Sequence, residues 1–395
     1  MKVINRFLTN QNAQLTSLVI LAVLASAQSY FGSQNTIAES TELYTKYNNY
    51  LIFKLSFFHL IEDKDLYILY LNEQWDLFKY SPTFALLFGL FAWLPDFVGL
   101  TLWNLLNGLV FFLGLYYLPK IDIRTKGLIF VFVVLELVGS VQNEQSNALM
   151  AGLLLFTFGF LERDKYWLAA LCIVASIFIK LFGVVALALY FLYPNKWKLT
   201  YTTAVWVVVF TLLPLLVVGA DQLLFLYKSW GNLLANDHDA SHGMSVIGWL
   251  KTWFGWEPDK VVVAVVGAIL FCLPLLKIKS YSKYPFRVLM LASVLLWVII
   301  FNHRAESPTF IIAVSGVALW YFIQVPKTEN LILLLLTLMF SILSPTDIVP
   351  AFVRTEWFEP YVVKAVPCIL VWVKIIYDLL TGTFEPRIST EQIQD

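Results

Sequence analysis

Charged residues are scarce in this chain. They make up 14% of its 395 residues, where soluble domains carry about 25%. Hydrophobic residues reach 59%, against roughly 45–50% in soluble domains. They gather in long runs such as 201–218 and 261–276, and a helix that crosses a bilayer needs about 20 mostly apolar residues. The composition therefore argues against a soluble protein and predicts an all-α polytopic membrane protein.

Cysteines and linkers are equally few. Cys172, Cys272 and Cys368 lie inside apolar segments at no metal-ligand spacing, which argues against a disulfide framework. No Gly/Ser linker divides the chain, so we expect one membrane domain, 1–395. The net charge is zero and gives no reason to expect nucleic acid as a partner. Residues 18–25 could form a signal-peptide core, but we find no convincing A-x-A cleavage site there and favour a first spanning helix.

The basic residues predict the topology. Lys and Arg accumulate in cytoplasmic loops, and the strongest basic loops are at 120–126, 163–165, 196–198 and 277–287. All four are inside if the chain crosses about twelve times with both termini cytoplasmic. We expect spans at about 14–32, 99–118, 127–141, 147–161, 166–180, 181–193, 199–218, 261–276, 286–301, 308–323, 330–344 and 361–380, followed by a tail, 381–395.

One apolar segment must not cross. Residues 84–94 are apolar but short, and a span there would place every later basic loop outside. We therefore expect a re-entrant or interfacial helix on the outer face, where a cavity or protein surrounds its ends. The first outer loop, up to residue 80, is too long for a simple connector, and 52–61 has an apolar face that suits the membrane surface. A second outer loop is expected at 219–260.

This topology places most of the unusual polar residues outside. Lys79 and Lys180 suit a lipid phosphate, because cations neutralise a leaving phosphate. Gln145 and Asn147 open a span and can hydrogen-bond sugar hydroxyls. For each of them the alternative is an ordinary polar residue at a span end, although ionisable residues inside apolar segments, as Lys180 is, default to functional candidates.

Two histidine-containing segments are also expected outside. His303, Arg304 and Glu306 lie between two spans: either Arg304 pairs with Glu306, or Arg304 binds phosphate while Glu306 acts as a base. His238, Asp239 and His242 have the spacing of one helical face, but no HExxH motif supports zinc. We read those three as solvated loop residues and expect no metal.

Several of these motifs together resemble glycosyltransferase family 87, the polyprenol-phosphate-mannose-dependent mannosyltransferases of the GT-C membrane fold. The resemblance runs from about residue 48 to 197, with weaker similarity beyond. It rests on Asp65-Leu66-Tyr67, Phe78-Lys79-Tyr80-Ser81-Pro82, Trp103 with Asn107, Gln145-Ser146-Asn147, Leu161-Glu162-Arg163 and Lys180. It implies a GT-C-like module at 14–197, followed by C-terminal transmembrane helices at 198–380.

The resemblance also implies an activity. A sugar, mannose or another hexose, would pass with inversion from a polyprenyl-phosphate donor to a glycolipid or glycan acceptor on the outer face of a cytoplasmic (inner) membrane. No cofactor is implied. Together with the residues singled out above, the candidate site comprises donor-phosphate residues (Lys79, Lys180, Arg304, Tyr80), sugar or acceptor residues (Gln145, Asn147, His303, His238) and catalytic candidates (Asn49, Asp76, Glu306, Glu144).

The chain departs from the family at the expected base. The family has an Asp near the start of the first outer loop, and the best register puts Asn49 there. A neutral amide cannot be a general base, so either Asp76, Glu306, Glu144 or Glu42 takes that role, or the protein binds without catalysing. The rival functions are a transporter or flippase of lipid-linked sugars and a non-catalytic member of an envelope-polysaccharide complex.

Overall fold

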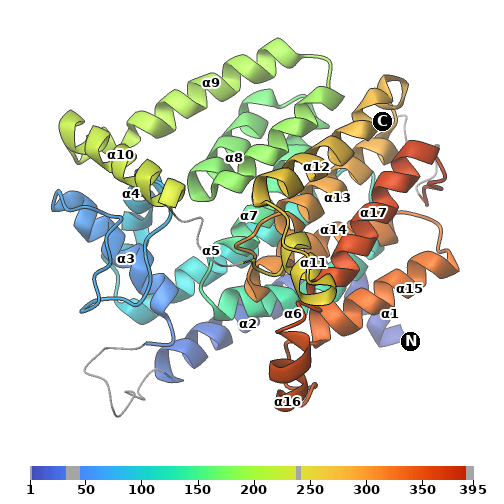
Figure 1. Ribbon diagram of the computed structural model, residues 1–395, viewed down its shortest axis with the longest axis horizontal. Helices are drawn as coiled ribbons and strands as arrows, with labels where there is room; N and C mark the ends of the chain where they lie inside the picture. The colour runs from blue at the N-terminus through green and yellow to red at the C-terminus, as the bar shows by residue number, and fades with distance from the viewer. Residues whose placement is uncertain (1, 33–44, 237–241, 388–395) are drawn as a thin grey trace.

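The computed structural model describes residues 2–32, 45–236 and 242–387, which are helical apart from loops and one isolated bridge (Figure 1). The first half contains α1 Lys2–Leu8, α2 Gln11–Phe31, α3 Asn48–Ile61, α4 Pro82–Ala92, α5 Asp96–Tyr117, α6 Ile123–Gln142, α7 Asn147–Leu161, α8 Tyr166–Ile179 and the 3₁₀ helix η2 Leu181–Leu192. The second half contains α9 Lys196–Leu212, η3 Leu213–Leu216, α10 Ala220–Asn236, α11 Val246–Phe254, α12 Lys260–Cys272, η4 Leu273–Leu276, η5 Ile278–Ser280, α13 Tyr284–Ile300, η6 Ser307–Thr309, α14 Phe310–Phe322, α15 Thr328–Leu336, η7 Thr337–Leu343, α16 Ala351–Val353, η8 Arg354–Phe358 and α17 Ala365–Thr381.

The helices follow the predicted spans closely. Among the described residues, four helical stretches are long and apolar enough to cross a membrane: α2, α5, α6, and α9 continued by η3. Shorter apolar helices occupy most of the other predicted spans, and α17 lies at the last one. Their bounds agree with the predicted ones within about one helical turn. The chain is thus a polytopic helical membrane protein, and the number of twelve crossings stays a prediction.

Helix α4 differs from its neighbours in length and position. Ser81 caps its N-terminus by accepting a hydrogen bond from the Phe84 N–H, Pro82 occupies its first turn, and Pro95 follows its end. Its eleven residues reach about 16 Å, roughly half a hydrocarbon core. The Ser81 hydroxyl also donates to the Phe178 carbonyl at 2.6 Å, which fixes the start of α4 at the end of α8. This geometry agrees with the expectation that α4 does not span.

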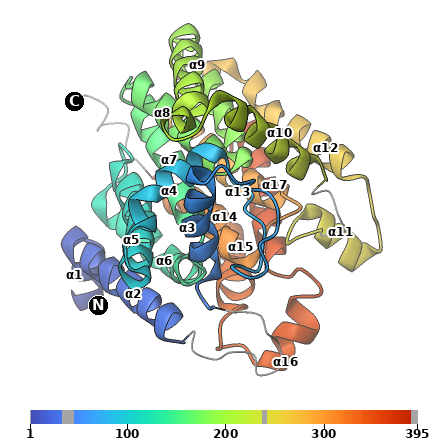
Figure 2. The same cartoon turned by 90° about the vertical axis from the view of Figure 1, so that its left-hand side faces the viewer.

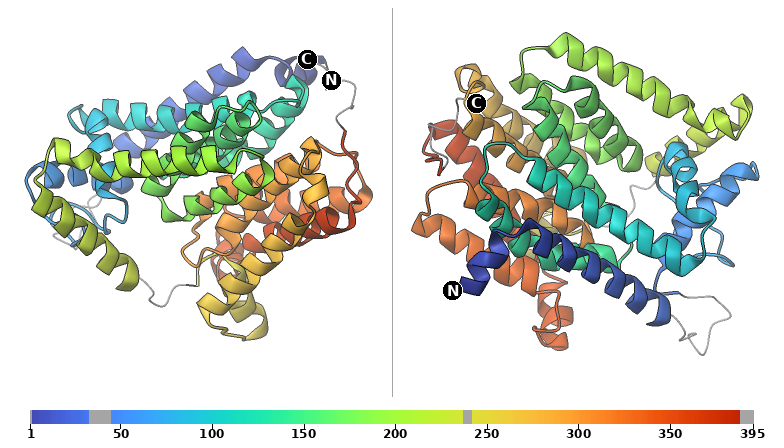
Figure 3. Two further views of the ribbon diagram at one scale, coloured as in Figure 1. Left: turned by 90° about the horizontal axis from the view of Figure 1, so that it is seen from above. Right: turned by 180° about the vertical axis from the view of Figure 1, so that it is seen from behind.

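The core of the bundle depends on close helix contacts. A Cβ atom added to Gly152 of α7 would lie 2.5 Å from the Val110 carbonyl of α5, and one added to Gly114 would meet the Gly152 carbonyl at 2.7 Å. Small residues allow such backbone approach between membrane helices. Helices α13 and α14 lie at the centre of the bundle, and nearly all their side chains are buried. Behind them α2 runs beside α5 (Figure 3).

The predicted cytoplasmic loops meet at one end of the bundle, which we call the basic end. Arg287 forms an ion pair with Glu162, with Nη2 2.8 Å from Oε2. The Tyr284 hydroxyl donates to the Pro119 carbonyl, and the Lys277 ammonium donates to the Leu380 carbonyl. These contacts join loops that are far apart in the sequence, as a shared side of the membrane requires.

The loops predicted to be outside meet at the opposite end, which we call the cavity end. Helices α3, α4 and α10 lie there and face the viewer in Figure 2. Within the second predicted loop the structure places two helices, α10 and α11. The Met244 N–H donates to the Ala305 carbonyl at 2.8 Å, which joins this loop to the α13–η6 connection.

The orientation can be tested by labelling. We expect Asp221→Cys, on α10 at the cavity end, to react with a membrane-impermeant maleimide in right-side-out vesicles. Lys279→Cys, at the basic end, should react only after permeabilisation, because both side chains are exposed and basic loops stay cytoplasmic. The parent chain measures the background from its cysteines. Labelling of Lys279→Cys in sealed vesicles would reverse the orientation.

Candidate functional site

A cavity of about 360 Å³ opens at the cavity end of the bundle. The first loop, the α6–α7 turn, the α8–η2 break, α10 and the α13–η6 connection all contribute to it. Nine of the twelve site residues proposed from the sequence line it: Asn49, Asp76, Lys79, Tyr80, Gln145, Lys180, His303, Arg304 and Glu306. Ile52, Phe53, Leu181, Phe182 and Leu234 also line it and add apolar surface.

Lys180 reaches the cavity from a break between two helices. α8 ends at Ile179, Lys180 has an extended backbone (φ −139°, ψ 123°), and η2 begins at Leu181. Its ammonium donates to the Asn147 Oδ1 at 2.7 Å and lies 5.9 Å from the centre of the Tyr80 ring. The break thus directs the cation into the cavity, away from the apolar helices on both sides of it.

A chain of hydrogen bonds links Lys180 to Glu306. Asn147, the first residue of α7, donates from Nδ2 to the Gln145 Oε1 at 2.6 Å. Gln145 in turn donates from Nε2 to the Glu306 Oε2 at 2.9 Å. The Glu306 carboxylate therefore bonds to Gln145, 161 positions away in sequence, and the chain orders one cation, two amides and one carboxylate along one wall.

The first loop supplies the facing wall. The Lys79 ammonium lies 3.4 Å from the Asp76 carboxylate. Asn49 lies in the first turn of α3 and donates from Nδ2 to the Asn143 carbonyl at 2.8 Å. An aspartate at 49 would set a carboxylate against that carbonyl. The amide is therefore a side chain that suits this contact, because its Nδ2 donates to the carbonyl oxygen.

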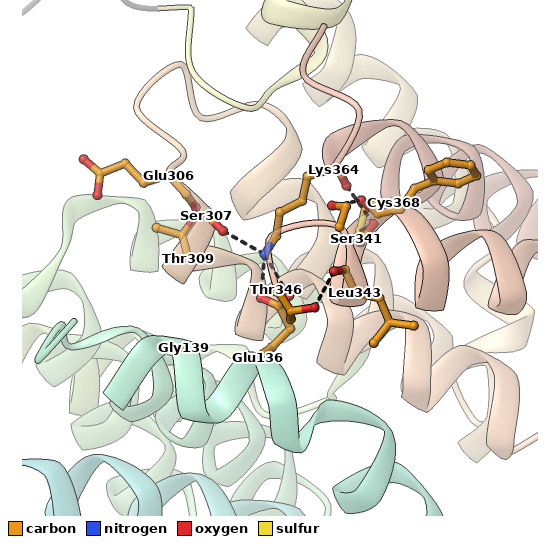
Figure 4. Close-up of polar contacts among 12 residues, drawn as sticks. Glu136, Gly139, Glu306, Ser307, Thr309, Ser341, Leu343, Thr346, Lys364 and Cys368 are labelled. Atoms are coloured by element: carbon orange, nitrogen blue, oxygen red, sulfur yellow. Dashed lines mark hydrogen bonds and ion pairs between the residues drawn. The ribbon is translucent and has the colours of Figure 1, made fainter. Parts of the chain in front are cut away.

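A buried ion pair lies behind the α13–η6 connection, which carries Glu306 and which we call the Glu306 loop (Figure 4). Lys364, just before α17, lies 2.8 and 3.0 Å from the two carboxylate oxygens of Glu136 on α6. Its ammonium also donates to the Ser307 Oγ at 3.0 Å, and Ser307 follows Glu306 directly. In Figure 4 the Glu306 side chain points away from Lys364. Neither Lys364 nor Glu136 was predicted from the sequence, although a charged residue inside the apolar stretch 127–141 is a signal of function.

The remaining candidates lie apart from the cavity or outside the described residues. Asn147 reaches the site through Gln145 and Lys180, as described above. Glu144 is buried behind the cavity, its carbonyl accepts from the Trp103 indole at 2.7 Å, and burial raises the pKa of its carboxyl to about 8. His238, Asp239 and Glu42 lie outside the described residues. Within the described part of the chain, no group of three or more His, Cys, Asp or Glu side chains is placed to hold a metal.

Glu144 makes stability depend on pH in a defined direction. Its carboxyl has a usual pKa of 4.5 and a pKa of about 8 in the fold, so the stability due to the bound proton is present below pH 4.5 and is lost as the pH rises to 8. We expect Glu144→Gln to gain melting temperature relative to the parent between pH 5 and pH 8. In a chain of 395 residues, 1 kcal/mol shifts the melting temperature by about 1 °C, so we expect a gain of a few degrees. The same difference in melting temperature between Glu144→Gln and the parent at pH 5 and at pH 8 would contradict this prediction.

Comparison with known proteins gives one family. The model of glycosyltransferase family 87 matches residues 78–345, more than half of the chain. The match contains Lys79, Gln145, Lys180 and Glu306 and begins just after Asp76. No curated protein matches the chain. The region of family likeness therefore extends further towards the C-terminus than the sequence motifs indicated, and it leaves out the start of the first loop.

Proposed function

The chain belongs to glycosyltransferase family 87, and from this premise we propose that it transfers a sugar from a polyprenyl-phosphate donor at the cavity end. The family indicates a membrane glycosyltransferase. The donor, a hexose such as mannose, the glycolipid or glycan acceptor, the extracytoplasmic location of the cavity end, and the GT-C fold belong to the proposal. The observation that carries it is the cavity itself, which combines cations, carboxylates and apolar side chains.

The cations of the cavity suit the donor phosphate. Lys79 and Lys180 come from separate segments and both line the cavity, as does Arg304. Charge-assisted hydrogen bonds from such groups are shorter and stronger than neutral ones. They stabilise the negative charge that grows on the phosphate as the sugar leaves. Apolar residues of the same cavity, Phe182 and Leu234 among them, suit the first isoprene units of the carrier.

The proposed reaction is a single displacement with inversion. An acceptor hydroxyl forms the new bond to the anomeric carbon, and the bond from that carbon to the phosphate oxygen breaks. The bonding electrons leave with the polyprenyl phosphate, and the hydroxyl proton passes to a carboxylate. Asp76 and Glu306 both line the cavity and are the two candidates for that base. Gln145 and His303 line it too and suit the sugar hydroxyls.

The direct test is transfer of radiolabelled sugar. Membranes that contain the protein should move label from polyprenyl-phosphate mannose, or from another polyprenyl-phosphate hexose, to an extractable glycolipid or glycan, and matched membranes without it should not. A flippase would move the donor across the bilayer without forming a new glycoside. Donor binding without transfer to any acceptor fraction would support the non-catalytic alternative instead.

The two cavity lysines carry a prediction about donor affinity. A hydrogen bond to a charged group contributes about 1.5–3 kcal/mol, so Lys79→Ala and Lys180→Ala should each weaken donor binding by about 10–100-fold. Lys228→Ala is the matched control, because Lys228 is an exposed cation on α10 that does not line the cavity. Binding is measured by titration of donor into the purified protein. Equal affinity in the parent and both cavity variants would refute phosphate binding by these lysines.

A further inference from the structure

The basic end has a cavity of its own. It has a volume of about 550 Å³ and lies between the α5–α6 connection, the segment before α13 and the end of α17. Lys120, Lys277 and Lys283 line it, together with the hydroxyls of Ser280 and Ser282. Its apolar wall is formed by Phe286, Leu289, Leu379 and Phe384. It therefore combines three cations with an apolar floor, at the opposite end of the bundle from the proposed transfer site.

The charge of this cavity is positive on balance. Asp378 is the one acidic residue that lines it within the described part of the chain. Its carboxylate lies 2.6 Å from the Lys374 ammonium and accepts from the Thr383 hydroxyl at 2.9 Å, while Lys374 also pairs with Glu329 at 3.2 Å. The Lys120 ammonium lies 5.5 Å from the centre of the Tyr284 ring at the cavity wall. Lys277 donates to the Leu380 carbonyl, and the charges of the three lining lysines exceed that of Asp378, which leaves a net positive charge that suits an anion.

The cavity opens where apolar surface begins. Leu276 and Ile278, on either side of Lys277, are 77% and 72% exposed. Tyr377 and Leu380 of α17 are exposed beside Asp378 and Leu379. Such side chains are expected against lipid, while long lysine side chains keep their ammonium groups at the interface. An occupant of this cavity therefore lies at the membrane boundary, with its charged part near the lysines and its apolar part against Phe286 and Leu289.

We propose that this cavity binds the headgroup phosphate of an anionic phospholipid from the leaflet at the basic end. Basic pockets between membrane helices on the cytoplasmic side bind such headgroups. A single lysine in a cytoplasmic loop is explained by membrane topology alone. Three lysines around a cavity with an apolar floor match both the phosphate and the acyl chains of a phospholipid. The lipid would hold together the α5–α6 connection, the start of α13 and the end of α17.

The test compares two double variants with the same loss of charge. Lys120→Gln with Lys283→Gln removes two cavity lysines, and Lys165→Gln with Lys279→Gln removes two exposed lysines of the same end that do not line the cavity. Binding of phosphatidylglycerol and of phosphatidylcholine to the purified protein is measured by native mass spectrometry. The parent should retain phosphatidylglycerol, and the cavity variant should bind it about thirtyfold more weakly, while the control stays within about twofold of the parent.

Three results would overturn the proposal. The first is an equal loss of phosphatidylglycerol from both double variants, which would assign the effect to general charge. The second is equal retention of phosphatidylcholine by the parent. The third is displacement of the lipid by millimolar inorganic phosphate, which would make the occupant a free anion. If the cavity double variant does not fold, Lys283→Gln against Lys279→Gln gives the same comparison with one charge removed.

Discussion

Sugar transfer is expected to fall by about 10²–10⁴-fold when Asp76→Asn and Glu306→Gln are combined, which is the usual contribution of a general base. Transfer to a hydroxyl needs a proton acceptor within about 3 Å of the attacking oxygen. Asn49 cannot take that role, and its amide is already bonded to the Asn143 carbonyl. Among the proposed carboxylates that the structure describes, Asp76, Glu144 and Glu306, only Asp76 and Glu306 line the cavity.

The single variants identify which carboxylate acts. The variant that alone lowers turnover while donor affinity stays unchanged marks the base, because a base acts on the chemical step. Asp347→Asn is a suitable control, since Asp347 pairs with Arg354 at 2.8 Å on the surface and does not line the cavity. Normal turnover in the double variant would show that neither carboxylate accepts the proton.

Lys364→Met is expected to destabilise the protein by about 3–5 kcal/mol, because it leaves the Glu136 carboxylate buried without its partner. Lys364 and Glu136 are 5% and 4% exposed at their side chains. Replacing both with apolar residues, Lys364→Met with Glu136→Leu, should restore much of that loss, since a buried pair is often replaceable by packed apolar groups. Melting temperatures of the two single variants and the double variant measure the loss of stability and its recovery.

The double variant also tests what the pair does for the Glu306 loop. It still lacks the bond from Lys364 to the Ser307 Oγ, so transfer should stay reduced after stability returns. The control is Lys374→Met with Asp378→Leu, which removes a partly buried ion pair at the basic end and makes no contact with η2. That control should change melting temperature and leave donor affinity as it was. A doubly apolar variant with full stability and full transfer would show that the pair has no part in placing the loop.

Much of the fold could be predicted because lipid leaves the backbone few choices. Within a bilayer the backbone groups must bond internally, so apolar runs become helices. The expected span 147–161 is α7 with the same bounds. A charge in the middle of an apolar run predicted the break at Lys180, and the structure has an extended residue there. The helices inside the second outer loop were not predicted, because α10 carries mixed polar and apolar residues.

The candidate site could be predicted as a group and not in its contacts. Basic-loop parity predicts that these segments share a side of the membrane, and nine of the candidates line one cavity, while their roles there stay predictions. Basic-loop parity does not predict where a side chain points. Arg304 and Glu306 are near neighbours in sequence, yet the Glu306 carboxylate accepts from Gln145. Glu136 and Lys364 are 228 positions apart, and no local pattern joins them. Glu144 is adjacent to Gln145 in sequence but is buried behind the cavity.

The 3₁₀ geometry of η2 sets the depth of Lys180. A 3₁₀ helix rises about 2.0 Å per residue, against about 1.5 Å in an α-helix. The twelve residues of η2 therefore cover about 24 Å, where an α-helix would cover about 18 Å. At its far end the Tyr193 hydroxyl donates to Glu162 at 2.5 Å and anchors η2 to the basic end. Rewinding η2 as an α-helix would shorten it by about 6 Å and draw the Lys180 ammonium towards that anchor, so the pitch of one short helix determines whether this cation reaches the cavity.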